Sequence, residues 1–199
     1  MKALLKAILV IGAVLWAERV RSQSTFIFNN YVPFDGIDAP VFDAQGNRLS
    51  GQNYVAILYG GLTTDSLAPA WDEVNFHVMA QIPFTFMPGG QDGYFRYSGY
   101  VQVSTVPAGV LAWIQVRAWD TRLGGTYDEV RTLGMGGYGE SPLFQAMGGD
   151  PSGGVPGLPQ PLMGLQSFSL RPVVPEPGTV LLLAAGLSLL LFRGRYKRG

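Results

Sequence analysis

The sequence contains no cysteine among its 199 residues. This absence excludes disulfide bonds, thiolate metal sites and cysteine nucleophiles, and with them the cross-links that usually stabilise a small secreted domain. The chain has one histidine, His77, so a histidine-rich metal site is excluded as well. No G-x-S-x-G sequence of a serine hydrolase and no twelve-residue EF-hand pattern occurs. We therefore expect no cofactor and no metal, and a fold stabilised by packing.

Lysine is missing from the middle of the chain. Residues 23–177 carry six arginines and 13 acidic residues, so this part is acidic by about seven charges. The remaining basic residues lie at the two ends: Lys2, Lys6, Arg19, Arg21, Arg193, Arg195, Lys197 and Arg198. Because the middle has no basic stripe to meet phosphate backbones, nucleic acid is excluded as a partner of the folded part.

The N-terminal end has the pattern of a secretory signal peptide. The two N-terminal lysines precede an uninterrupted apolar run at residues 7–17, which is too short to span a bilayer. Ser22 allows cleavage before Gln23. We interpret residues 1–22 as a signal helix, with the secretion translocon and a signal peptidase as partners.

The C-terminal end, residues 173–199, combines a helix breaker, an apolar segment and a basic stop. Two prolines around Glu176 keep the tripeptide 175–177 extended and accessible. We expect the uncharged segment 178–192 to form a short transmembrane helix, followed by arginines that can snorkel to the surface. The basic residues 193–199 favour a cytoplasmic C-terminus. The pattern predicts a membrane-anchored precursor whose N-terminal part is exported.

Pro175-Glu176-Pro177, the apolar segment and the arginine-rich end together resemble the PEP-CTERM sorting signal over residues 174–199. In that family an exosortase, a membrane transpeptidase-like cysteine enzyme, recognises and processes the signal near the tripeptide. The resemblance implies a bacterial protein sorted to the cell surface or the extracellular matrix. By analogy, its sorting motif is Pro175, Glu176 and Pro177, and its basic stop is Arg193, Arg195, Lys197 and Arg198. The alternative is an ordinary C-terminal membrane anchor after a proline-rich stalk, without processing.

The middle of the chain, residues 23–172, has an all-β pattern. Short runs of β-branched and aromatic residues alternate with glycine, proline, asparagine and aspartate. The predicted strands are residues 25–29, 40–42, 54–59, 74–79, 94–103, 111–119, 143–147 and 166–170. We expect a β-sandwich or jelly roll of two packed sheets.

Two of these strands are predicted to be central, because residues 94–103 and 111–119 alternate between apolar and polar positions. The core face of 111–119 comprises Ala112, Ile114, Val116 and Ala118. Its other face carries Leu111, Trp113 and Trp119, which require either a covering segment or a partner. Residues 54–59 are apolar on both faces, so something should cover their outer side.

The segments that connect the predicted strands also have recognisable sequence patterns. Residues 43–47 predict a tight turn in which Gly46 takes a positive φ. Residues 127–133 predict a short helix with acidic residues in its first turn, and residues 148–164 a long Gly- and Pro-rich loop. Residues 134–139 match G-x-G-x-x-G, but no strand precedes and no helix follows, so we interpret them as a flexible loop rather than a dinucleotide site.

The titratable residues give only weak signals. Two carboxylates for glycoside cleavage could come from Asp72, Glu73, Asp120, Asp128 and Glu129, and oxygen ligands for calcium from Asp35, Asp38 and Asp43. We interpret these as ordinary loop and helix-start acids, and His77 as a solvent-facing strand residue.

Aromatic residues near the predicted central strands give a second functional hypothesis. They are Trp71, Trp113, Trp119, Tyr94, Tyr97 and Tyr100, most of them expected in the core. The runs 40–43, 59–61 and 115–120 are similar to globular domains found on PEP-CTERM precursors, a likeness that implies no catalytic residue. We predict a non-enzymatic surface or matrix protein whose ectodomain is structural or adhesive. The alternative is a carbohydrate-binding module, or a weak glycan-active enzyme, in contact with extracellular polysaccharide.

Overall fold

The computed structural model describes residues 23–72, 82–84, 92–150 and 157–174. Within these ranges the chain forms short and long strands, one α-helix, α2 (Tyr127–Leu133), and one 3-10 turn, η1 (Pro33–Asp35). The prediction of an all-β ectodomain is confirmed at this level. The predicted signal helix (1–22) and transmembrane helix (178–192) lie outside the described residues, and no described helix is long and apolar enough to span a bilayer.

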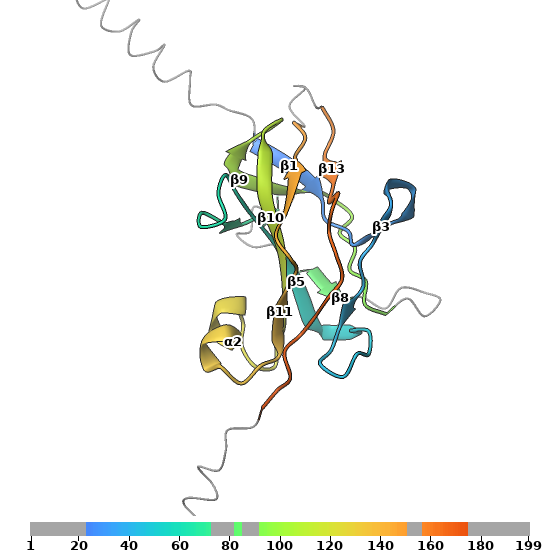
Figure 1. The fold of residues 1–199 in the computed structure, drawn as a ribbon, viewed down its shortest axis with the longest axis vertical. Coiled ribbons are helices and arrows are strands. Elements are labelled where there is room, and N and C mark those ends of the chain that lie inside the picture. The colour runs from blue at the N-terminus through green and yellow to red at the C-terminus, as the bar shows by residue number, and fades with distance from the viewer. Residues whose placement is uncertain (1–22, 73–81, 85–91, 151–156, 175–199) are drawn as a thin grey trace, which may run out of the picture.

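The larger sheet is built around two long antiparallel strands, β5 (Gly51–Gly61) and β10 (Leu111–Asp120), which pair from Trp113↔Gly61 to Asp120↔Tyr54. Figure 1 shows these two strands crossing the middle of the molecule. The strand order of this larger sheet is β11-β10-β5-β6, with β12 also paired to β10 and β8 to β5. The four shorter strands are β6 (Ala68–Pro69), β8 (Ile82–Phe84), β11 (Tyr138–Glu140) and β12 (Phe144–Met147).

The second sheet has the order β13-β1-β9-β7. Its members are β1 (Gln23–Ile27), β7 (Trp71–Asp72), β9 (Val101–Pro107) and β13 (Gln160–Pro161), with β13 parallel to β1. Two small ladders complete the fold: β14 (Phe168–Ser169) pairs parallel with β4 (Val41–Phe42), and β2 (Tyr31–Val32) pairs antiparallel with β3 (Ile37–Asp38).

One hydrophobic core contains residues of both larger sheets. The alternation predicted for residues 111–119 is confirmed, since Ala112, Ile114, Val116 and Ala118 are all fully buried. They share a cluster with Val103 of β9. The two sheets approach closely: a Cβ atom added at Gly60 of β5 would lie 2.8 Å from a Val103 methyl group.

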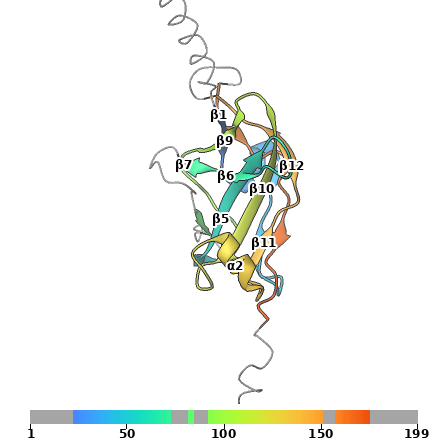
Figure 2. The ribbon, with the colours of Figure 1, turned by 90° about the vertical axis from the view of Figure 1, so that its left-hand side faces the viewer.

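Helix α2 covers the outer face of β5 and β10, as Figure 2 shows. A second buried cluster joins Val55, Ile57, Tyr59 and Trp119 of the strands to Tyr127 and Val130 of the helix and Tyr138 of β11. The predicted cover over residues 54–59 is therefore confirmed. Of the large residues on the outer face of β10, Trp119 is buried under the helix, whereas Leu111 stays 48% exposed at the far end of the strand.

The helix itself has the predicted bounds, 127–133. Thr126 caps it: its hydroxyl accepts the Glu129 backbone N–H, and the Glu129 carboxylate accepts the Thr126 N–H in return. Gly134 ends the helix in the left-handed conformation.

The predicted strand 94–103 is wrong in its first part. The strand begins only at Val101, and residues 94–100 follow an irregular path. Here the Asn30 side chain accepts the N–H of Phe95, and the N–H of Tyr97 is shared by the Asn29 side chain and the Phe28 carbonyl oxygen. The backbone pairing at this point is an isolated β-bridge between Asn29 and Arg96 rather than a ladder. Predicted strand 74–79 lies outside the described residues.

The other predicted strands are confirmed with shifted ends. The turn at 43–47 is confirmed too, with Gly46 at a φ of 86°. Residues 134–139 are not a flexible loop throughout, because Tyr138 and Gly139 belong to β11. The predicted long loop 148–164 contains β13, and its residues 151–156 lie outside the described ranges.

Candidate functional site

The last described segment, residues 168–174, is hydrogen-bonded along most of its length; we call it the C-terminal strap. After β14 it leaves β4 and runs beside residues 134–139, which we call the glycine segment. Its backbone bonds are Leu170 N–H to Phe42 O (2.8 Å), Arg171 N–H to Tyr138 O (2.8 Å), Gly137 N–H to Arg171 O (2.9 Å) and Val174 N–H to Met135 O (2.7 Å). Partner numbers fall as strap numbers rise, so the two segments are antiparallel.

Glycines in this segment allow the two backbones to touch. A Cβ atom at Gly136 would lie 1.9 Å from the carbonyl oxygen of Pro172, and one at Gly139 would lie 2.5 Å from that of Ser169. Gly136 also has a φ of 87°, which disfavours any other residue. The G-x-G-x-x-G match is thus explained by backbone packing. A helix precedes the segment and strand β11 begins within it at Tyr138, the reverse of the order that a dinucleotide site requires.

Side chains add to this contact. Leu170 is buried in the main core. The Arg171 guanidinium lies 4.8 Å from the centre of the Tyr138 ring, donates to the Tyr138 hydroxyl at 3.1 Å and lies 3.8 Å from a Glu140 carboxylate oxygen. The Arg171 side chain is 59% exposed, so its ion pair adds little. The backbone bonds and the burial of Leu170 are what hold the strap.

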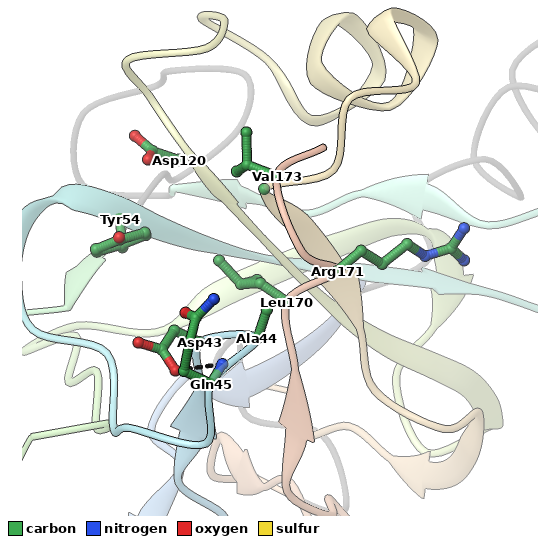
Figure 3. Close-up of a pocket in the computed structure, with 9 residues that line it drawn as sticks. Asp43, Ala44, Gln45, Tyr54, Asp120, Leu170, Arg171 and Val173 are labelled. Carbon is green, nitrogen blue, oxygen red and sulfur yellow. Dashed lines mark hydrogen bonds between the residues drawn. The ribbon is translucent and has the colours of Figure 1, made fainter. Parts of the chain in front are cut away.

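A shallow pocket of about 120 Å³ lies beside the strap. It is shown in Figure 3 and brings together the 43–45 turn, the β5 and β10 strands and the strap itself. Its lining residues are Asp43, Ala44, Gln45, Tyr54, Asp120, Gly137, Leu170, Arg171 and Val173. In Figure 3 the Arg171 guanidinium points away from Asp43 and Gln45, so the residue lines the pocket without aiming its charge into it.

Both carboxylates of the pocket are already engaged. Asp120 accepts the Arg122 Nε at 2.8 Å and 3.1 Å, and Arg122 also reaches the Tyr54 hydroxyl at 3.2 Å. Burial raises the pKa of Asp120, but its hydrogen bonds to Arg122 outweigh burial and hold that pKa below the ordinary value. The Asn47 side-chain amide likewise holds the pKa of Asp43 low. Two ionised, bonded carboxylates do not supply a general acid at neutral pH.

The other predicted acids are scattered. Glu129 is the capping residue of α2, and Asp38 accepts the Tyr94 hydroxyl at 2.6 Å. Asp35 and Asp128 lie in η1 and in the first turn of α2. Among the described residues, no group of three or more acidic or histidine side chains could hold a metal ion. Glu73 and His77 lie outside the described ranges.

The predicted aromatic residues do not form one exposed platform. Trp119 and Tyr94 are buried, and Trp113, Tyr97 and Tyr100 are partly buried. Trp71 is 40% exposed, but it lies in β7 of the second sheet rather than in the sheet of Trp113. The aromatic residue that lines a pocket, Tyr54, was not singled out as a site residue from the sequence.

The predicted sorting residues follow the strap in sequence. Pro175, Glu176, Pro177, Arg193, Arg195, Lys197 and Arg198 lie outside the described residues, and the strap ends at Val174, directly before the tripeptide. Residues 173–198 match the family model of the PEP-CTERM protein-sorting motif, which confirms the resemblance. No curated protein and no solved structure matches the chain. The match begins inside the strap, so the sorting signal and the folded body share Val173 and Val174.

Proposed function

We propose that this chain, which carries a PEP-CTERM sorting motif, is exported, held in the membrane by residues 178–192 and processed by an exosortase-like enzyme at or near Pro175–Pro177. The observation that carries the proposal is the family match at residues 173–198. The apolar run at residues 7–17 supports it from the other end of the chain, because a signal peptide and a basic C-terminal stop give the same topology. The destination is the cell surface or the extracellular matrix.

The shape of the folded body supports this arrangement. Figures 1 and 2 place β1, in blue, near one end of the long axis, while the strap, in red, leaves at the other end. A body of this shape extends away from the membrane when it is anchored through the strap. We propose that its two larger sheets form a β-sandwich, because one core contains residues of both.

We further propose a structural or adhesive ectodomain without catalytic activity. Two of the candidate acidic residues have structural roles: Asp120 pairs with Arg122, and Glu129 caps α2. The hydrogen bonds to Arg122 hold the pKa of Asp120 below its ordinary value, so this carboxylate does not supply a general acid at neutral pH.

Mass spectrometry of the protein isolated from its own cells tests the sorting. We expect an N-terminus at Gln23 and a C-terminus near residues 175–177. Cells that lack the exosortase-like enzyme serve as the control and should retain the intact tail. A mature protein that ends at Gly199 in normal cells would refute processing, and would leave residues 178–192 as a permanent anchor.

A second candidate function is weak binding of a glycan at the pocket of Figure 3. Tyr54 offers a partly exposed ring, while Asp43 and Gln45 offer polar groups beside it. A glycan-binding screen with the purified protein, and with Tyr54→Ala, decides the matter. Binding that Tyr54→Ala abolishes and Trp71→Ala preserves supports a site in this pocket, and no detectable affinity disposes of it.

A further inference from the structure

The backbone groups of the strap that bond to the folded body cannot bond to a processing enzyme at the same time. Enzymes that cut or transfer peptides hold the residues around the reacting bond in an extended form, through backbone hydrogen bonds. In the strap, the N–H groups of Arg171 and Val174 and the carbonyl of Arg171 are already bonded to the glycine segment. An enzyme that uses these backbone groups has to replace Tyr138, Gly137 and Met135 as their partners.

The short distance between the strap and the sorting motif also restricts the space around the enzyme. Val174 makes the last bond to the body that the described residues contain, and Pro177 is three residues further on. Three extended residues reach about 10 Å at most. This is about the distance between two packed sheets, so an enzyme around the tripeptide meets the folded body itself.

The contact between the strap and the glycine segment can also break while the rest of the domain stays folded. It involves residues 171–174, all exposed to solvent, whereas the preceding Leu170 is buried in the core. Release of these four residues leaves the β14–β4 ladder and the core in place. The residues immediately upstream of the sorting motif can therefore detach without unfolding of the domain.

From these observations we propose that residues 171–174 must leave the glycine segment before the sorting motif is processed, so that the docked strap slows the exosortase-like enzyme. This inference rests on the proposed function, because it concerns the enzyme that acts at the same motif. It makes the glycine segment the element of the ectodomain that sets the rate of processing.

The chain offers a matched pair of substitutions for a test that leaves the sorting signal unchanged. Gly136 and Gly46 have φ values of 87° and 86°, so alanine strains both backbones equally. A Cβ atom at Gly136 meets the Pro172 carbonyl oxygen at 1.9 Å, whereas one at Gly46 meets nothing within 4 Å. Only Gly136→Ala therefore weakens the docking of the strap.

The experiment follows the full chain in cells that contain the exosortase-like enzyme, with a pulse of label and mass analysis of the C-terminus. We expect the initial rate of processing to rise about fivefold or more in Gly136→Ala, because about 1 kcal/mol of steric repulsion from the Pro172 carbonyl, which Gly46→Ala lacks, favours the released strap. Gly46→Ala should be processed at the wild-type rate. Equal rates in the two variants, or slower processing of Gly136→Ala, would overturn the inference.

A second variant keeps the test decisive if Gly136→Ala fails to fold. Residues 171–174 are duplicated between Val174 and Pro175, so that one copy stays docked and the other precedes the motif in its native sequence. We expect this protein to be processed faster than the wild type. Processing at the wild-type rate or below it contradicts the inference. If neither the wild type nor the duplication variant ever loses its tail, the proposed function itself fails, which is a different result.

Discussion

Val174 donates its backbone N–H to the carbonyl oxygen of Met135 at 2.7 Å, 39 residues earlier in the chain. The next residue, Pro175, opens the sorting tripeptide and has no N–H to donate. Within the described residues, the bonds of the strap therefore reach the residue that directly precedes the sorting tripeptide. A change in the packing of the domain at this point acts next to the site of the proposed processing.

The first prediction concerns the docking of the strap by itself. In the purified protein, Gly136→Ala should make the backbone amides of Arg171 and Val174 exchange with deuterium about fivefold faster or more, because the added methyl group meets the Pro172 carbonyl. Hydrogen-exchange mass spectrometry of the peptide that contains residues 168–174 measures this effect. Gly46→Ala is the control and should leave this peptide unchanged. Equal exchange in both variants would show that the clash is relieved elsewhere.

The second prediction concerns the buried side chain of Asn30. Its Nδ2 donates to the carbonyl oxygens of Ala39 (2.8 Å) and Gly93 (3.0 Å), and its Oδ1 accepts the N–H of Phe95 at 2.7 Å. Asn30→Ala removes three buried hydrogen bonds at once, although the Gly93 carbonyl oxygen still accepts the Val41 N–H, so the free energy of unfolding should fall by about 2–4 kcal/mol.

Urea unfolding of the purified protein measures this loss. Asn29 makes a single side-chain bond to a backbone N–H at 2.8 Å, and Asn29→Ala should cost about 1 kcal/mol. Equal losses for the two variants would mean that the Asn30 amide does not organise the irregular path of residues 94–100.

The third prediction concerns the loss of stability at acidic pH. Because the pKa of Asp120 is lower in the folded state than in the unfolded state, its stabilising contribution is complete above the unfolded value and is lost as pH falls through the folded value. At neutral pH, Asp120→Asn should lower the free energy of unfolding by about 1–3 kcal/mol, because its side chain is only 8% exposed and binds a charged group.

That difference should vanish well below the ordinary aspartate pKa of about 3.9. Urea unfolding at several pH values measures it, with Asp65→Asn, at an exposed turn, as the control. A penalty for Asp120→Asn that stays constant into strong acid would contradict the role given to the Arg122 pair.

The fourth prediction concerns the loss of stability at basic pH. Burial, and then the hydrogen bond from its hydroxyl to Glu140 (2.8 Å), raise the pKa of Tyr127 well above the ordinary value. A raised folded pKa means that the contribution to stability is present below about pH 10, the unfolded tyrosine value, and is lost as pH rises toward the folded one. The wild type should therefore lose stability above that pH more steeply than Tyr127→Phe. Identical slopes would show that the hydroxyl is solvated in the folded state.

Local patterns in the sequence were enough to predict the elements that depend on near neighbours. The alternation at 111–119 predicted β10 and its core face, and the spacing at 127–133 predicted α2. The tripeptide with its apolar and basic flanks predicted the sorting signal. In each case the residues that determine the structure or the match lie within one short stretch.

The predictions that were wrong share a different cause, which is contact with residues far away in the sequence. Residues 94–100 alternate like a strand, but their backbone pairs through an isolated β-bridge, and the side chains of Asn29 and Asn30, more than 60 residues earlier, accept the N–H groups of Tyr97 and Phe95. The role of Gly136 depends on the backbone of Pro172, 36 residues later. Neither partner can be read from a local pattern. The one available signal was the density of glycine directly after the helix, which we interpreted as flexibility where the structure has close packing.

The antiparallel course of the strap has a mechanical consequence. When a surface protein is held by its C-terminal end, a pull on the body reaches the described part of the fold through the strap, which leaves along the long axis in Figure 1. Hydrogen bonds between antiparallel segments run across the chains, so a pull along the strap loads the bonds of Arg171 and Val174 together. The buried Leu170 and the parallel β14–β4 ladder behind them also resist the pull.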